Sequence, residues 1–367
     1  MMTTDTLIIE SDELLGSEAA AEVAPNSASV KSTADEGSVL PLADPGVSHL
    51  RPRSKQGSDI AFPRLTSSRP IEFESLTLSQ LSRDLIELTK PRIVVMILVT
   101  TLATAFVGAG QAVGLQDLFW LLLGTSLIAA SAGSANQVWE RVIDKQMART
   151  ASRPVATGRV QPAHGVVYTA AIGISGLAIL FRNFQFVPAM VGLATWLLYV
   201  LIYTPMKTRT SWNTTVGAIA GALPMLIGYT ATGGSLIDVT GWLLVGILVA
   251  WQYPHFMAIA WMYRQQYRDA GFRMSTTVDP TGGSAGIQSI GGSILLIVCA
   301  VSLCWMRSTI TGAVVASCAV LLFSWPMLRV SIQFNKSPND QIARLLLRKS
   351  LIVLPMVLAV VTIALLW

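Results

Sequence analysis

The stretch LFWLLLGTSLIAASAGSANQVWERVID, residues 118–144, joins an apolar run to a row of polar acceptors. Residues 118–135 are apolar and nearly long enough to cross a bilayer as a helix, which takes about 20 residues. If the helix continues, Asn136, Glu140 and Asp144 stand at i, i+4 and i+8, so their side chains share one face over about 12 Å. Charge beside a bilayer is costly and is usually retained for a task. The stretch therefore predicts a membrane span that ends in a functional polar row.

The rest of the chain repeats the apolar part of this pattern. Of its 367 residues, 52% are hydrophobic and 13% are charged, and the mean hydropathy is +0.55. This composition is far too apolar for one soluble core. Apolar stretches predict spans at residues 94–113, 118–135, 164–181, 186–204, 214–232, 241–263, 287–305, 309–330 and 351–367. The predicted fold is an all-α integral membrane protein with about nine transmembrane helices.

The N-terminal segment differs from the apolar region. Residues 1–78 are rich in Ser, Ala, Asp, Glu, Pro and Gly and poor in aromatic residues, which predicts a disordered cytoplasmic tail. Residues 79–367 then form the transmembrane domain. The tail lacks a basic start followed by an apolar core, and its early acidic residues argue against organelle import. A bacterial plasma membrane fits this pattern better than a mitochondrion.

Lys and Arg alternate between the loops that join the predicted spans. The loops after spans two, four, six and eight are basic, whereas the intervening loops hold only Arg182 and Arg307. The positive-inside rule then places the N-terminus and the basic loops in the cytoplasm and the C-terminus outside. This topology accounts for the net charge of +5 and leaves no basic domain for nucleic acid. The three cysteines lie inside predicted spans, with no disulfide framework or zinc motif.

The polar row offers hard oxygen ligands. Mg2+ prefers such ligands and is usually held by one or two carboxylates together with substrate phosphates. Lys and Arg, which bind phosphate, lie close by in the same loops: Arg141, Lys145, Arg149, Arg153, Lys207 and Arg209. The combination predicts a metal-bridged diphosphate at the mouth of an apolar cavity. The alternative is a solvated helix end whose carboxylates are balanced by cations that only set topology.

The run NQVWERVIDKQMARTASRPVATGRV, residues 136–160, resembles the first signature of the UbiA family of membrane prenyltransferases, Asn-x-x-x-acid-x-x-x-Asp. Residues 203–231 and 253–274 are similar to the branch of that family that farnesylates heme. The resemblance implies a helical bundle around a central cavity, with Mg2+ held by Asn136, Glu140 and Asp144. It implies farnesyl transfer from farnesyl diphosphate to a vinyl group of heme B, which is a substrate and not a cofactor. It also makes a heme A synthase a candidate partner.

The second signature departs from the family pattern. Gln266 stands before Tyr267, where the branch carries an acidic residue. A Gln carbonyl can accept a bond from a metal ion or water but adds no charge. Asp269, one turn on, is the substitute catalytic candidate, and the alternative is a loop acid paired with a neighbouring Arg. The resemblance also makes Arg264, Gln266 and Tyr267 candidates for substrate binding.

His255 lies in the stretch YPHF inside the sixth predicted span, beside Pro254. A lone histidine inside a membrane span is often a hydrogen-bonded structural residue. The resemblance instead implies contact with heme, either as an iron ligand, a common role of imidazole, or near the reacting vinyl group.

Two other functions share parts of this pattern. A UbiA-type enzyme that prenylates an aromatic quinone or chlorophyll precursor would carry the same polar row. The stretches YPHF, residues 253–256, and MARTASRP, residues 147–154, fit such an enzyme less well. A transporter would also show polar residues within the membrane. However, the charges here cluster at span ends and not at mid-membrane.

Overall fold

The computed structural model describes residues 78–307 and 309–366, and every regular element in that part is a helix. Nine helical segments of these residues are long and apolar enough to cross a membrane: 91–109, 115–144, 162–184, 186–206, 213–231, 239–262, 283–306, 310–336 and 340–366. The predicted all-α membrane fold is confirmed. Apart from Leu78, which begins the first helix, the predicted tail lies outside the described residues.

Short helices and one π-helix accompany the spans. The elements, in chain order, are α2 (Leu78–Leu88), α3 (Pro91–Ala109), α4 (Leu115–Asp144), α5 (Pro154–Thr157), α6 (Pro162–Phe184), α7 (Phe186–Leu197), η1 (Leu198–Tyr203), α8 (Thr204–Met206), α9 (Asn213–Ala222), α10 (Pro224–Ala231), α11 (Val239–Met262), α12 (Arg264–Asp269), α13 (Ser275–Val278), α14 (Gly283–Arg307), α15 (Ile310–Lys336) and α16 (Asp340–Leu366).

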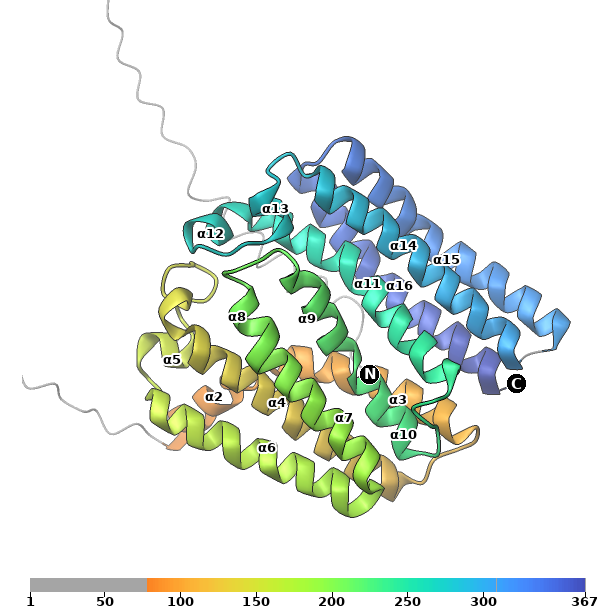
Figure 1. Ribbon diagram of the computed structural model, residues 1–367, viewed down its shortest axis with the longest axis horizontal. Coiled ribbons are helices and arrows are strands. Elements are labelled where there is room, and N and C mark those ends of the chain that lie inside the picture. The colour runs from red at the N-terminus through yellow and green to blue at the C-terminus, as the bar shows by residue number, and fades with distance from the viewer. Residues whose placement is uncertain (1–77, 308, 367) are drawn as a thin grey trace, which may run out of the picture. The chain divides into compact units, whose positions relative to one another are not determined.

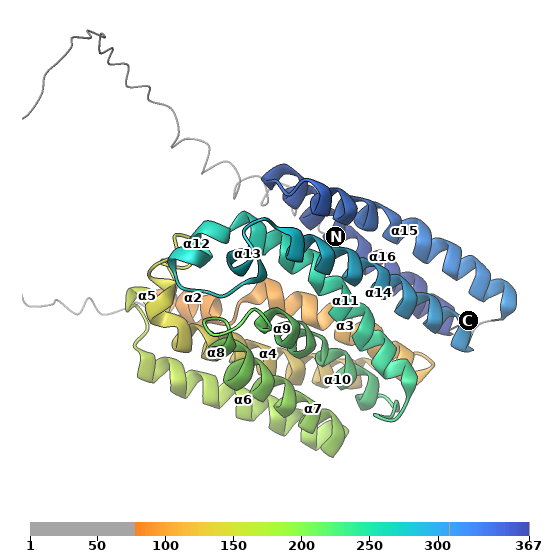
Figure 2. The same ribbon diagram turned by 45° about the horizontal axis from the view of Figure 1, so that its top comes forward.

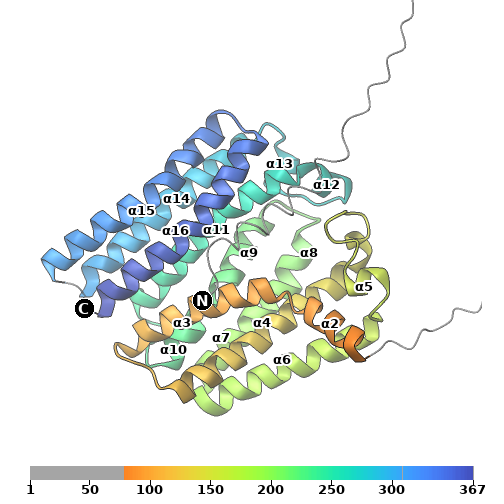
Figure 3. The ribbon, with the colours of Figure 1, turned by 180° about the vertical axis from the view of Figure 1, so that it is seen from behind.

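The spans pack side by side. α11 packs on α14 and α16, α14 packs on α15, and α4 packs on α6 (Figure 1). Seen from behind, α3 lies between α16 and α4 (Figure 3). The short helices α5, α12 and α13 gather at one end of the spans (Figure 2). We call this the polar end, and it carries the connecting segments 145–161, 207–212 and 263–282.

Proline and π-helical geometry shape two of the spans. Pro224 begins α10 and lacks a backbone N–H, so the fifth span is divided into α9 and α10. The fourth span passes through the π-helix η1, which includes Tyr199 and Tyr203. Insertions of this kind are frequent at functional sites. Both tyrosines line the central cavity described next.

Candidate active site

A cavity of about 800 Å³ lies inside the bundle, lined mainly by α3, α4, η1, α9, α11 and α16. This volume falls within the range of small-molecule sites. One face of α4 runs along it, because its lining residues recur every three or four positions from Thr125 to Asp144. At 1.5 Å per residue this face is about 28 Å long. The cavity can therefore hold an extended ligand parallel to the helices.

The two parts of this cavity differ in character. At the polar end it is lined by two carboxylates, Glu140 and Asp144, and by five cations: Lys90, Arg92, Arg149, Arg153 and Lys207. Deeper along the helices the lining is mostly apolar: Met96, Ile97, Ile128, Ile227, Leu248 and Leu354. Cations in excess over carboxylates attract an anionic group. The cavity thus suits a ligand with an anionic head and an apolar tail.

The first two acceptors of the polar row each meet a lysine. Lys90 Nζ donates to Asn136 Oδ1 at 2.6 Å, and Lys207 Nζ donates to Glu140 Oε1 at 2.8 Å. Burial lowers the pKa of Lys90 to about 7, and the charges of Arg153 and Lys207 add to this lowering. Burial also disfavours the charged form of Lys207, but the Glu140 carboxylate outweighs it and raises the pKa of Lys207. Glu140 and Lys207 form a buried ion pair.

The last acceptor, Asp144, meets an arginine. Arg153 Nη1 lies 2.8 Å from both carboxylate oxygens of Asp144, which is fully buried. Arg149 donates to the Tyr267 hydroxyl at 3.0 Å and lies over the Tyr263 ring, 4.8 Å from its centroid. These contacts join segment 145–153 to α12 at the cavity mouth. The structure thus brings Asp144, Arg149, Arg153 and Tyr267 together in the lining of one cavity.

The junction of α2 and α3 contributes two cations to the cavity, Lys90 and Arg92. Neither was among the site residues predicted from the sequence. Lys90 has a left-handed backbone (φ 53°, ψ 61°) between α2 and α3. Gln137 Nε2 donates to the last two carbonyls of α2, at 3.2 Å and 3.1 Å, which fixes this junction against α4. The sequence does carry a signal for these two cations. Lys90 and Arg92 flank Pro91 at the start of the first span, at the same end of the spans as the basic loops.

Replacing Lys90 by Met tests its part in binding the anionic head. The change removes a buried cation from the cavity and leaves Asn136 Oδ1 without its 2.6 Å donor. Truncating one partner of a buried charged contact costs about 2 kcal/mol or more, so we expect KM for a prenyl diphosphate to rise roughly 30-fold. The matched control is Arg83→Met, which removes an exposed cation from α2. A KM equal to that of the control variant would exclude the role.

Three predicted cations do not reach the cavity. Arg141, Lys145 and Arg209 are exposed and are not among its lining residues. Arg141 follows Glu140 by one position, which turns its side chain about 100° around α4. Its Nη1 donates to the carbonyl of Val138 instead. Proximity in sequence to the polar row was therefore not enough to place these side chains in it.

Most of the second signature also points elsewhere. Asp269 is exposed and accepts a hydrogen bond from Gln265 Nε2 at 3.0 Å. Arg264 pairs with Asp340 at 2.8 Å, and neither Arg264, Gln266 nor Asp269 lines the cavity. α12 is only six residues long and presents Tyr267 inward, so its other polar side chains face away. In this structure Asp269 thus lies outside the cavity, as Gln266 does.

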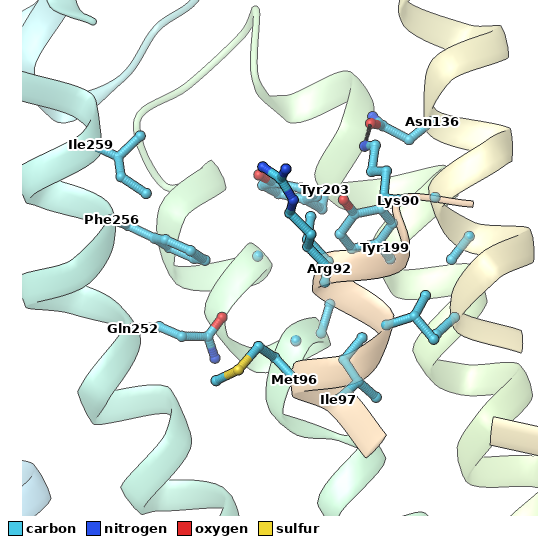
Figure 4. Close-up of a pocket in the computed structure, with 18 of the residues that line it drawn as sticks. Lys90, Arg92, Met96, Ile97, Asn136, Tyr199, Tyr203, Gln252, Phe256 and Ile259 are labelled. Carbon is cyan, nitrogen blue, oxygen red and sulfur yellow. Dashed lines mark hydrogen bonds between the residues drawn. The ribbon is translucent and has the colours of Figure 1, made fainter. Parts of the chain in front are cut away.

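α11 forms an aromatic wall across the cavity from the polar row. His255 stacks on Trp251 with ring centroids 4.6 Å apart, and its Nδ1 lies 3.0 Å from Ser350 Oγ of α16. Figure 4 shows Phe256 projecting from α11 toward Arg92 on α3, while Lys90 reaches across to Asn136. His255 therefore makes a structural hydrogen bond and also lines the cavity. Aromatic side chains of this kind can pack against a planar ring.

The donors of the polar row fit Mg2+. Within the described residues no group of three or more His, Cys, Asp or Glu side chains is arranged to hold a metal ion. The row instead combines two buried carboxylates with the amide oxygen of Asn136 on one helical face. All are hard oxygen donors, and Mg2+ completes such a set with phosphates and water. The site is thus suited to a metal ion shared with an anionic ligand.

These features fit a membrane-embedded enzyme whose cavity suits an amphiphile with an anionic head. The UbiA prenyltransferase family model matches residues 97–354. The chain belongs to the UbiA prenyltransferase family, as its signature stretches indicate, and is a prenyltransferase.

Known relatives and solved structures agree with this assignment. The chain is 58% identical to the protoheme IX farnesyltransferase of Rhodopirellula baltica over 76% of its own length and 98% of that protein. It is 42% identical to the Solibacter usitatus protoheme IX farnesyltransferase, over 59% and 76%. A digeranylgeranylglyceryl phosphate synthase shares the fold with a TM-score of 0.64 at 11% identity, covering 78% and 98% of the two chains. A UbiA homolog from Archaeoglobus fulgidus bound to GPP and Mg2+ gives a TM-score of 0.57 at 16% identity, over 76% and 99%.

Proposed function

We propose that this enzyme transfers a farnesyl group from farnesyl diphosphate to a vinyl group of heme B and so forms heme O. The observation that carries the proposal is one cavity in which a cation-lined polar row faces an aromatic wall with His255. The row suits a diphosphate, the apolar depth suits a prenyl tail, and the wall suits a tetrapyrrole. The names of the relatives at 58% and 42% identity support this choice of substrates over an aromatic quinone precursor.

The polar end drives departure of the diphosphate. As the bond between the farnesyl C1 and oxygen breaks, its electron pair leaves with the diphosphate, and Lys90, Lys207, Arg149 and Arg153 neutralise that charge. Asn136, Glu140 and Asp144 would hold Mg2+, which supplies Lewis-acid stabilisation of phosphate oxygens when bound. The buried ligands exclude bulk water from the reacting bond, and this strengthens each electrostatic contact.

The acceptor side then captures the allylic cation. The electron pair of the heme vinyl group forms the new carbon–carbon bond, and water adds to the resulting cation with loss of a proton. This yields the hydroxyethylfarnesyl side chain. His255, held by Ser350 and stacked on Trp251, positions the tetrapyrrole on the aromatic wall. No strong base at carbon is needed.

The polar end faces the cytoplasm in this proposal. The basic connecting segments gather at that end, and the positive-inside rule assigns it to the cytoplasmic side of a bacterial inner membrane. The nine candidate spans of the described residues make the chain a multi-pass membrane protein. A heme A synthase is the partner that we expect to receive the product.

Incubation of the purified protein in lipid nanodiscs with heme B, farnesyl diphosphate and Mg2+ tests the function. We expect the pigment to gain the mass of one farnesyl group plus one hydroxyl group, because both substrates meet in one cavity. A chelator should stop the reaction, and added Mg2+ should restore it. A parallel tube contains an aromatic acid in place of heme. Unchanged heme together with a prenylated aromatic acid would overturn the acceptor assignment.

A further inference from the structure

A second hollow, an open groove on the outer face of the bundle, meets the central cavity at Ile128. This groove has a volume of about 580 Å³ and lies between α4, α6, α7 and η1. Its lining is mostly apolar and includes Ile174, Leu177, Leu193 and Trp196, and it extends along α4 to Arg141 near the polar end. Ile128 of α4 lines both the groove and the central cavity. The two spaces are therefore separated at this point by one side chain.

The packing around Ile128 explains why this side chain closes the gap between the cavity and the groove. Ile128 is 3% exposed and lies against two glycines, Gly176 of α6 and Gly192 of α7. A Cβ placed on Gly176 would come within 2.9 Å of Ile128 Cγ1, and one on Gly192 within 2.7 Å of Ile128 Cδ1. The absence of side chains at both glycines lets Ile128 fill the gap between the helices. Interior packing of this density fixes its position.

Ile128 also lies at a distinctive depth on α4. It precedes Asn136 by eight residues and Glu140 by twelve, so it is about 12 Å and 18 Å from them along the helix axis. A tail that extends from a diphosphate at the polar row follows the same lining face and reaches Ile128. A chain of three isoprene units is comparable in length to this path.

We propose that Ile128 sets the length of the prenyl chain that the enzyme accepts. The inference rests on the proposed function, because it places the prenyl tail in the central cavity. Ile128 lies beside the apolar part of the cavity at the depth that a third isoprene unit would reach, one helical turn short of Thr125, the deepest α4 residue of the lining. Its side chain closes the route to the groove, where a fourth unit has room. Shortening this one side chain joins the two spaces and relaxes the length limit.

A competition assay tests the proposal. Ile128→Ala is incubated with heme B, Mg2+ and equal amounts of farnesyl and geranylgeranyl diphosphate, and the two heme products are separated by mass. We expect the ratio of geranylgeranyl to farnesyl product to rise about tenfold or more over wild type, because even one methylene changes selectivity by that factor. The ratio comes from one tube, so it is unaffected by any loss of folded enzyme.

Two further variants separate chain length from general loosening. Ile97→Ala removes the same side chain from the central cavity at a position that does not line the groove, and its ratio should stay near wild type. Leu193→Phe, added to Ile128→Ala, refills the groove and should return the ratio toward wild type. An unchanged ratio in Ile128→Ala, or an equal rise in Ile97→Ala, would overturn the inference. Wild type that farnesylates no heme would instead overturn the proposed function.

Discussion

Asp144→Asn lowers farnesyl transfer by about 10²–10³-fold, the loss that follows removal of one charge-stabilising group from an active site. Asn keeps the shape of the side chain and an oxygen that can accept from Arg153. It removes one of the two buried carboxylates that would hold Mg2+ against the diphosphate. The expected signature is a fall in kcat measured by heme product formation in nanodiscs.

The control for this variant lies on the same helix. Asp117→Asn changes an exposed carboxylate in the first turn of α4 and should leave turnover unchanged. Thermal unfolding of both variants in detergent shows whether folding is preserved. If Asp144→Asn folds and turns over like the control variant, the polar row does not hold the metal ion.

Lys207→Met has the second large effect, and it acts on both stability and activity. The change leaves Glu140 as a buried charge without its partner at 2.8 Å. Breaking a buried ion pair from one side costs about 3–5 kcal/mol, because the remaining charge is uncompensated. We expect a large drop in the unfolding temperature together with loss of farnesyl transfer.

A double variant separates the two effects. Lys207→Met with Glu140→Gln removes both charges, so most of the stability should return. Activity should not return, because the diphosphate has lost a cation and the metal ion has lost a carboxylate. Recovery of transfer in the double variant would show that the pair is only structural. Failure to recover stability would show that the cost of Lys207→Met comes from lost packing and not from charge.

The fold was predictable because membrane spans depend on one simple property. Stretches of about 20 apolar residues identify the spans, and each of the nine candidate spans of the described residues overlaps one that was expected. Helix ends were less predictable. α4 continues from the apolar run through Asp144, since the polar row faces the cavity and not water.

The residues of the candidate site were predictable only where their spacing along one helix places them on the same face. Asn136, Glu140 and Asp144 share the cavity face because of their spacing. Arg141 has the right charge but stands one position off that face. Lys90 could not be found from the row, because the contact between Lys90 and Asn136 spans 46 positions. Tertiary packing, and not the local sequence pattern, determines which Lys and Arg side chains line the cavity.

The three ion contacts of the polar row have a consequence for the order in which ligands bind. Each acceptor holds a cation from a different segment: Lys90 before α3, Lys207 after α8 and Arg153 before α5. A bare metal ion would displace these cations and leave them facing one another. A bare diphosphate would draw them away and leave two carboxylates unpaired in the membrane. Only a ligand that brings both signs of charge can exchange partners throughout, so the metal ion and the diphosphate should enter together as one complex.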